Sequence, residues 1–382
     1  MAANRITELF LQEGQSAWQD DISRDMLNKG EIAREINETG IRGLTSNPTI
    51  FEKAISAGHA YDESVAELVA QGLEDAEIFE SVAVADIQAA CDLFRALYDA
   101  SNGGDGFVSI EVSPLGARDA ERTATEARRL WRSVNRPNLM VKIPGTVEGS
   151  PVVQQMLDEG ININITLLFS VAAYERVARA YIAALKARRA RGESINRIAS
   201  VASFFVSRVD ALVDKQLDAL IASTTDEAKR AELAALKGKA AIANAKLAYK
   251  AFQEIFSGPE WEALAAAGAK VQRPLWASTS VKNPSYPDTL YVDELIGPDT
   301  VNTMPRPTVI AFLDHGTVAR TIDTGMQEAA ETMAALAAAG IDFQAVTDQL
   351  EEEGIAAFIK SFESLLSGVA SKRAELAAAP AD

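Results

Sequence analysis

The segment Asn138-Leu139-Met140-Val141-Lys142-Ile143-Pro144-Gly145 is typical of a buried β-strand that carries a single charge. A lysine is almost never fully buried unless it is paired, because removing its charge from water costs free energy. Burial favours the neutral amine, and a neutral amine can condense with a carbonyl group. Two interpretations of Lys142 therefore stay open on the strand pattern alone, a structural ion pair and a Schiff-base nucleophile.

Seven further segments along the chain share this strand-like pattern, and amphipathic helical stretches separate them. Together with Leu139–Pro144 they are Ser16–Asp21, Ile41–Asn47, Phe107–Val112, Asn162–Leu168, Arg197–Val206, Leu275–Ser280 and Val301–Met304. Alternating strands and helices predict a parallel sheet, and eight such units predict a closed α/β barrel of the (β/α)8 TIM type with additional helices.

The remaining sequence fits one barrel domain, residues 1–382, rather than several domains. We expect helical insertions at about 52–104 and 208–272, terminal helices at about 325–367, and a frayed tail at 370–382. Within these regions the periodic stretches are Asp62–Ala70, Ala76–Ala100, Asp226–Phe256, Gly325–Ala339 and Asp342–Leu366.

Composition excludes several classes of function. The formal net charge is −17, which argues against nonspecific binding to nucleic acid or to anionic membranes. One cysteine, Cys91, rules out a disulfide within the chain, and two histidines rule out a histidine-rich metal site. The first residues lack an apolar signal core, and no run of about 18 apolar residues occurs, so we expect a soluble cytoplasmic protein.

Polar residues recur on one face of several predicted strands, near their C-terminal ends. Side chains alternate between the two faces of a strand. Lys142 therefore lies opposite Val141 and Ile143, and Glu111 lies opposite Ile110 and Val112. By the same alternation Asn164 and Thr166 share a face in the next strand, and Asn47 ends an earlier one. Because barrel active sites lie at this rim, the pattern predicts a site around Lys142.

Two motifs give these residues a family context. Gly43-Leu44-Thr45-Ser46-Asn47-Pro48-Thr49-Ile50-Phe51 resembles the first signature of the transaldolases. The segments 138–144 and 160–169, taken together, resemble the second transaldolase signature. The segments Ser203–Arg208 and Trp276–Asn283 agree in order and spacing, and the similarity spans roughly residues 16–366. The length of the chain and the segment Trp276–Asn283 are most similar to those of the longer bacterial subfamily of transaldolases.

The resemblance implies a class I aldolase-type barrel with transaldolase activity. Such an enzyme transfers a dihydroxyacetone unit between sugar phosphates in the non-oxidative pentose phosphate pathway. Donors would be sedoheptulose 7-phosphate or fructose 6-phosphate, and acceptors glyceraldehyde 3-phosphate or erythrose 4-phosphate. The resemblance implies neither a metal nor an organic cofactor, and the partners expected are these substrates, with the chain a monomer or homodimer.

Residue roles follow from the same resemblance. Lys142 would form the imine with the donor ketone, and Asp20 would be the acid/base for the hydroxyl released as an aldehyde. Glu111 and Thr166 would hold a water that shuttles protons. Substrate binding would fall to Asn47, Asn164, Ser203 and Phe205, with the phosphate held by Arg208 and Lys282.

Two positions depart from the family pattern. Asp20 and Asp21 are adjacent, so either could be the acid/base. Lys282 stands where many members have a second phosphate-binding arginine, and a lysine binds phosphate as a point charge without bidentate geometry. Arg208 also has a structural interpretation, a helix-face cation paired with Asp210 or Asp214, and Lys282 could be a plain surface cation.

Three functions remain to be compared. The favoured one is transaldolase, and a related lysine aldolase that releases free dihydroxyacetone is the enzyme alternative. A noncatalytic sugar-phosphate-binding barrel is the third, and it predicts loss of the lysine or its carboxylates. Lys142, Glu111 and Asp20 are all present, which disfavours the third.

Overall fold

Seven parallel strands form one curved sheet in the order β1-β7-β6-β5-β4-β3-β2. The structure is a computed structural model and describes residues 3–56 and 58–378. The strands are β1 (Ser16–Gln19), β2 (Val108–Glu111), β3 (Leu139–Pro144), β4 (Ile163–Leu168), β5 (Ser200–Phe205), β6 (Arg273–Ala277) and β7 (Val301–Met304).

The segment around Leu44 closes the sheet into a barrel. Leu44 forms parallel bridges with Gln19 of β1 and with Val108 of β2. Backbone hydrogen bonds connect this segment to its neighbours on both sides. The Thr45 amide donates to the Gln19 carbonyl, and the Leu44 amide donates to the Phe107 carbonyl. The predicted strand at Ile41–Asn47 is therefore present only as this bridge, but it occupies the eighth place of the predicted (β/α)8 barrel, and the α/β barrel fold is confirmed.

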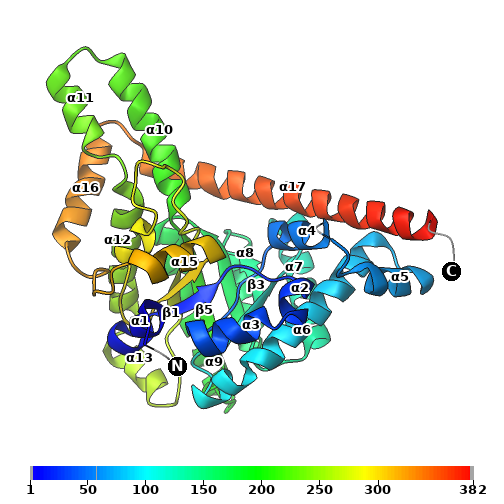
Figure 1. Ribbon diagram of the computed structural model, residues 1–382. Coiled ribbons are helices and arrows are strands. Elements are labelled where there is room, and N and C mark those ends of the chain that lie inside the picture. Colours follow the sequence, from blue (N-terminus) through cyan, green and yellow to red (C-terminus); the bar gives the residue numbers. More distant parts are fainter. Residues whose placement is uncertain (1–2, 57, 379–382) are drawn as a thin grey trace.

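Helices surround the barrel and extend from it (Figure 1). They are α1 (Arg5–Glu13), α2 (Arg24–Asn28), α3 (Glu31–Arg34), α4 (Pro48–Ser56), α5 (Asp62–Ala70), α6 (Asp75–Ala100), α7 (Ala120–Val134), α8 (Gly149–Asp158), α9 (Val171–Ala190), α10 (Ser207–Ser223), α11 (Glu227–Ala234), α12 (Ala240–Ile255), α13 (Gly258–Ala265), α14 (Leu290–Asp293), α15 (Arg306–His315), α16 (Met326–Ala338) and α17 (Phe343–Ala378). A π-helical turn, η1 (Glu35–Thr39), and a 3-10 turn, η2 (Pro114–Gly116), complete the set.

Two helical expectations differ from the structure. The helical stretch predicted over residues 226–256 is divided between α11 and α12. Gly238 lies between these two helices with a φ of 71°, which a helix cannot accommodate. The long helix α17 continues through residues 370–378, where we expected a frayed tail; residues 379–382 lie outside the described part.

The core lies between the outward face of the sheet and the helices. Val108 and Ile110 of β2, and Leu139, Val141 and Ile143 of β3, are all buried there. The opposite faces of the same strands carry Ser109, Glu111, Met140 and Lys142, as the alternation of side chains requires. Within the described residues, no helix is both long and apolar enough to cross a membrane.

The helix α17 runs alongside α4 and reaches the rim of the barrel (Figure 1). A hydrogen bond of 2.8 Å joins Thr49 of α4 to Ser361 of α17. Phe358 of α17 lines the same cavity as Lys142. The helix α17, close to the C-terminus, therefore covers part of the barrel rim at which the polar residues of the strands lie.

Candidate active site

Lys142 lies at the C-terminal end of β3 with its side chain inside the barrel. It is 5% exposed, and its Nζ lies 3.2 Å from Glu111 Oε2. The same ammonium donates to the Ser46 carbonyl at 3.2 Å, and the Phe358 ring centroid lies 6.0 Å away. The lysine is thus buried and paired, but its nitrogen also borders a cavity of about 320 Å³.

The strand register explains why these groups meet. Glu111 of β2 lies beside Lys142 of β3, which lies beside Asn164 of β4. In-register neighbours on parallel strands point to the same side, so all three side chains enter one layer of the barrel. Asn164 is fixed there by a 3.0 Å donation to Ser109 Oγ and a 2.7 Å bond accepted from Ser203 Oγ.

Asp20 enters the cavity from the end of β1, and Thr45 orients it. Thr45 Oγ1 donates to Asp20 Oδ1 at 2.6 Å and lies 2.6 Å from Thr303 Oγ1. Burial raises the pKa of Asp20, while Lys142 and the Thr45 hydroxyl oppose that rise. Asp21 does not line the cavity, and burial together with the Asp20 charge raises its pKa. The geometry favours Asp20 over its neighbour as the group that reaches a substrate.

Burial also raises the pKa of Glu111, with Lys142 opposing the shift and Asp20 adding to it. Two carboxyl groups therefore face one ammonium in a poorly solvated space. Acids whose pKa values are raised in this way can hold or release a proton nearer to neutral pH than free acids do.

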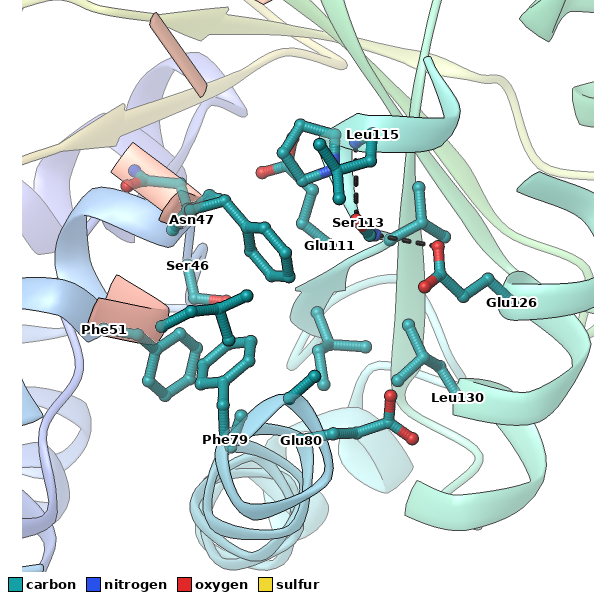
Figure 2. A pocket seen from close by; sticks show the side chains of 18 of the residues that line it. Ser46, Asn47, Phe51, Phe79, Glu80, Glu111, Ser113, Leu115, Glu126 and Leu130 are labelled. Carbon is teal, nitrogen blue, oxygen red and sulfur yellow. Dashed lines mark hydrogen bonds between the residues drawn. The ribbon is translucent and has the colours of Figure 1, made fainter. Parts of the chain in front are cut away.

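A second cavity, of about 240 Å³, is lined by Glu111 and shares Asn47 with the first cavity (Figure 2). Its walls are largely apolar and include Phe51 and Phe79, whose rings meet edge to face at 5.7 Å. At one side the Ser113 amide donates to Glu126 at 2.9 Å. Glu111 thus lies between this side cavity and the one that contains Lys142.

The end of β4 is irregular next to Thr166. The register shifts between Ile165 and Leu168, and Leu167 takes a φ of 61°. A non-glycine residue in this region is uncommon and marks a locally strained turn, which often occurs at functional sites. Thr166 Oγ1 is buried and has no hydrogen-bond partner among the described residues. Its hydroxyl is therefore available to another group.

Cations gather on the other side of the mouth. Arg208 stands in the first turn of α10, and its guanidinium carbon lies 5.8 Å from the Phe205 ring centroid. Lys282 follows β6 and donates to Ser280 Oγ at 2.7 Å. Burial lowers the pKa of Lys282, and the charges of Arg208 and Lys53 add to the effect.

The structural interpretation of Arg208 is not borne out. Asp210 instead accepts from the Ala241 amide and the Tyr291 hydroxyl, at 2.8 Å each. Asp214 accepts from the Gly238 amide at 3.0 Å and from the Tyr286 hydroxyl at 2.6 Å. Arg208 forms no ion pair with either carboxylate in residues 3–56 and 58–378. Burial lowers its pKa, and the charge of Glu353 on α17 opposes that shift.

The structure brings most of the predicted site residues to one cavity. Those that line it are Asp20, Asn47, Lys142, Ser203, Phe205, Arg208 and Lys282. Glu111, Asn164 and Thr166 do not line it; Glu111 contacts Lys142, and Asn164 supports Ser203 from below.

Sequence reasoning missed several residues that line this cavity, among them Thr45, Thr303, Lys53 and Phe358. Thr45 bonds to Asp20 and to Thr303, and the signal for Thr45 was its place within the first motif, two residues before Asn47. Lys53 has a weaker signal, its helical spacing from Thr49. Phe358 has none, because it comes from a helix more than 200 residues further along the chain than Lys142.

A buried lysine paired with a carboxylate lies at the C-terminal rim of a (β/α)8 barrel, beside cations that form no ion pair in the described part of the chain. This combination defines the class of lysine-dependent aldolase-type enzymes that act on phosphorylated sugars. Comparison with known proteins narrows this class. Residues 17–369 match the family model described as transaldolase/fructose-6-phosphate aldolase, and the chain belongs to that family.

Curated relatives cover almost the whole chain. Transaldolase 2 of Nostoc sp. is 49% identical over 375 residues, covering 97% of this chain and 98% of the relative. The transaldolases of Trichodesmium erythraeum and Saccharopolyspora erythraea are 48% and 49% identical, with the same coverage of 97% and 98%. These findings confirm the predicted family, the transaldolase function and the class of transferases.

Proposed function

We propose that Lys142 carries the transaldolase reaction as a Schiff-base nucleophile. Its amine attacks the donor ketone and expels water, which forms a protonated imine. Asp20 then takes the proton of the C4 hydroxyl while the C3–C4 bond breaks, and the bond electrons move into the imine as an enamine. The aldehyde leaves, and the enamine adds to the acceptor aldehyde by the reverse steps. The 3.2 Å contact between buried Lys142 and Glu111, beside the cavity, is the observation that carries the proposal.

The remaining roles follow from position. Glu111, against Lys142, and Thr166, with its free hydroxyl, would hold the water exchanged during imine formation. Ser203 and Asn47 would bind substrate hydroxyls, with Asn164 holding Ser203 and Phe205 forming an apolar wall. Arg208 would bind phosphate in a forked geometry, and Lys282 would add a point charge. Substrates would be fructose 6-phosphate or sedoheptulose 7-phosphate, with glyceraldehyde 3-phosphate or erythrose 4-phosphate as acceptors.

The test is reductive trapping. Borohydride added with fructose 6-phosphate should give a stable adduct, and mass mapping should place it on Lys142. An adduct on another residue, or none, would overturn the mechanism.

Transfer and simple cleavage need a separate measurement, because the family's description names an aldolase as well as transaldolase. Consumption of fructose 6-phosphate should depend on erythrose 4-phosphate. Rapid release of free dihydroxyacetone without acceptor would favour the aldolase.

We also propose that the chain acts in the cytoplasm as a single barrel domain, as a monomer or homodimer, and without nucleic-acid or membrane partners. The negative charge of −17 supports the absence of nucleic-acid and membrane partners, because it disfavours polyanionic surfaces. Light scattering of the purified chain would fix the oligomeric state, and retention on heparin at low salt would contradict the absence of polyanion binding.

A further inference from the structure

Three cations from three different elements border the cavity that contains Lys142. They are Lys53 on α4, Arg208 on α10 and Lys282 after β6. The described residues form many ion pairs, but none of those pairs includes any of these three cations. The chain has 54 acidic residues against 37 basic ones, so three positive charges at one cavity run against its overall charge.

These charges repel one another. Burial lowers the pKa of Lys282, and then Arg208 and Lys53 lower it further. Burial lowers the pKa of Arg208 as well. Like charges held at one place raise the free energy of the folded state unless an anion binds among them. The arrangement therefore suits an anionic ligand.

The position of Lys53 is set by the packing of α4. Thr49, Ile50 and Lys53 all line the cavity, and residues three and four apart share one face of a helix. Asn47 Oδ1 fixes the start of α4 by accepting from the Ile50 amide at 3.0 Å, and Thr49 ties the helix to α17. One face of α4 is thereby held against the mouth of the barrel.

We propose that Lys53 is a third phosphate-binding residue, which acts with Arg208 and Lys282 on the phosphate of the sugar-phosphate substrates. This inference rests on the function proposed above. Arg208 supplies the forked geometry, and the two lysines supply point charges from the other sides. Lys53 thereby offsets the loss of a second arginine at the position of Lys282.

A different role for Lys53 is purely electrostatic. Its charge lowers the pKa of Asp21, against the raising effects of burial and Asp20, so Lys53 could act through the carboxyl next to the acid/base Asp20 instead of on phosphate. That role would affect all substrates, phosphorylated or not. A phosphate-binding role affects phosphorylated substrates alone, and the two are therefore separable.

The experiment compares Lys53→Ala and Lys53→Arg, with Lys215→Ala as the control. Lys215 is an exposed lysine on α10 that does not line the cavity. Lys53→Ala should raise KM for fructose 6-phosphate about tenfold, the loss of one charge-assisted contact by an exposed lysine at the edge of the cavity. Inhibition by inorganic phosphate should weaken by a similar factor, while kcat and borohydride trapping with unphosphorylated fructose stay unchanged. Lys53→Arg should restore most of the affinity, and Lys215→Ala should behave as the parent.

An unchanged KM and an unchanged phosphate inhibition constant in Lys53→Ala would overturn the inference. Equal losses with fructose and fructose 6-phosphate, together with a shifted acid limb of the pH profile, would assign Lys53 to the Asp21 charge instead. Failure of the parent enzyme to trap fructose 6-phosphate on Lys142 would defeat the proposed function. In that case phosphate binding, measured by calorimetry on parent and Lys53→Ala, still decides the role of Lys53.

Discussion

Lys142, Asp20 and Glu111 determine the charge balance in the mouth of the barrel. Two carboxyl groups whose pKa values burial has raised face one ammonium. Such an arrangement stores a proton close to the reacting carbonyl and makes one acid available as a base. If the proposed roles of Lys142, Asp20 and Glu111 hold, the free-energy cost of burying these groups serves the reaction.

Lys142→Arg should abolish turnover and leave the fold intact. A guanidinium stays protonated and cannot form an imine, but it can keep the ion pair with Glu111. We expect kcat to fall by roughly 10³-fold or more, since a nucleophile is lost. Circular dichroism and the melting temperature serve as controls, and substantial turnover in this variant would contradict the assignment.

Asp20→Asn should lower kcat by roughly 10²- to 10⁴-fold, the usual contribution of a general base. It should also raise the melting temperature at pH 7. Because the folded-state pKa of Asp20 is raised, the folded protein binds this proton more tightly than the unfolded chain does. Stability of the parent therefore falls as pH rises from the ordinary aspartate pKa through the raised value.

The stability gain of Asp20→Asn should accordingly shrink as pH falls toward the ordinary aspartate pKa, because the parent carboxyl takes up its proton over that range. Asp21→Asn is the matched comparison, since Asp21 does not line the cavity. Activity lost in Asp21→Asn but kept in Asp20→Asn would move the acid/base role to Asp21.

Among the elements, α4 links one motif to both the fold and the site. Pro48 occupies the first helical position of α4, and Asn47 precedes it. The Asn47 side chain caps the helix by accepting from the Ile50 amide. Capping uses the side-chain oxygen, and the amide nitrogen can still donate to a ligand in the cavity that Asn47 lines. One residue can therefore begin the helix and contact the substrate.

Substitution of Asn47 separates these two roles. Asn47→Ala removes cap and donor together and should destabilise the fold by about 1 kcal/mol while raising KM. Asn47→Ser keeps a capping oxygen, so stability should be retained while affinity for fructose 6-phosphate falls. Denaturant unfolding and steady-state kinetics on both variants measure the difference. Normal kinetics in Asn47→Ser would show that Asn47 is only a cap.

At the scale of the whole molecule, a buried charge cluster joins the barrel at the end opposite to the active site. Asp105 accepts from Ser16 and Trp18 of β1, from Arg42 at 2.6 Å and from Arg273 of β6 at 3.3 Å. Asp105 precedes β2, and its partners come from β1, from β6 and from the segment that closes the barrel at Leu44, so the cluster joins the two sides of that segment. Burial acts to raise the pKa of Asp105, but Arg273 and Arg42 outweigh it and hold the pKa below its usual value.

Asp105→Ala should therefore destabilise the protein by about 3 to 5 kcal/mol, because two arginines would lose their buried partner. KM for fructose 6-phosphate should not change in the folded variant. In the parent protein, ionised Asp105 contributes its full stabilisation at pH values above the ordinary aspartate pKa. This stabilisation is lost as pH falls through the lowered pKa that Asp105 has in the folded state. Urea unfolding at several pH values tests this, with exposed Asp99→Ala as control; equal stability of parent and Asp105→Ala would refute it.

Much of the barrel could be predicted from local pattern. Apolar alternation located β3 and β7 at their observed bounds, and it placed Lys142 and Glu111 on the inward face. It overestimated the strand at Ile41–Asn47, because the rest of that segment is not paired as strand and Asn47 begins α4 instead. It also missed the break at Gly238, since a single glycine within an apolar stripe barely changes the helical period.

By itself the sequence determined the parallel α/β barrel, the family and the lysine at its rim, because these depend on short-range periodicity and on two contiguous motifs. Only the tertiary structure decided between Asp20 and Asp21 as the carboxyl that faces the cavity, and only it showed that Arg208 forms no ion pair with an aspartate among the described residues. It also brought Lys53 and Phe358 to the mouth. The physical reason is that a cavity is formed by side chains from distant segments, whose meeting depends on register and helix packing, and no local pattern encodes these.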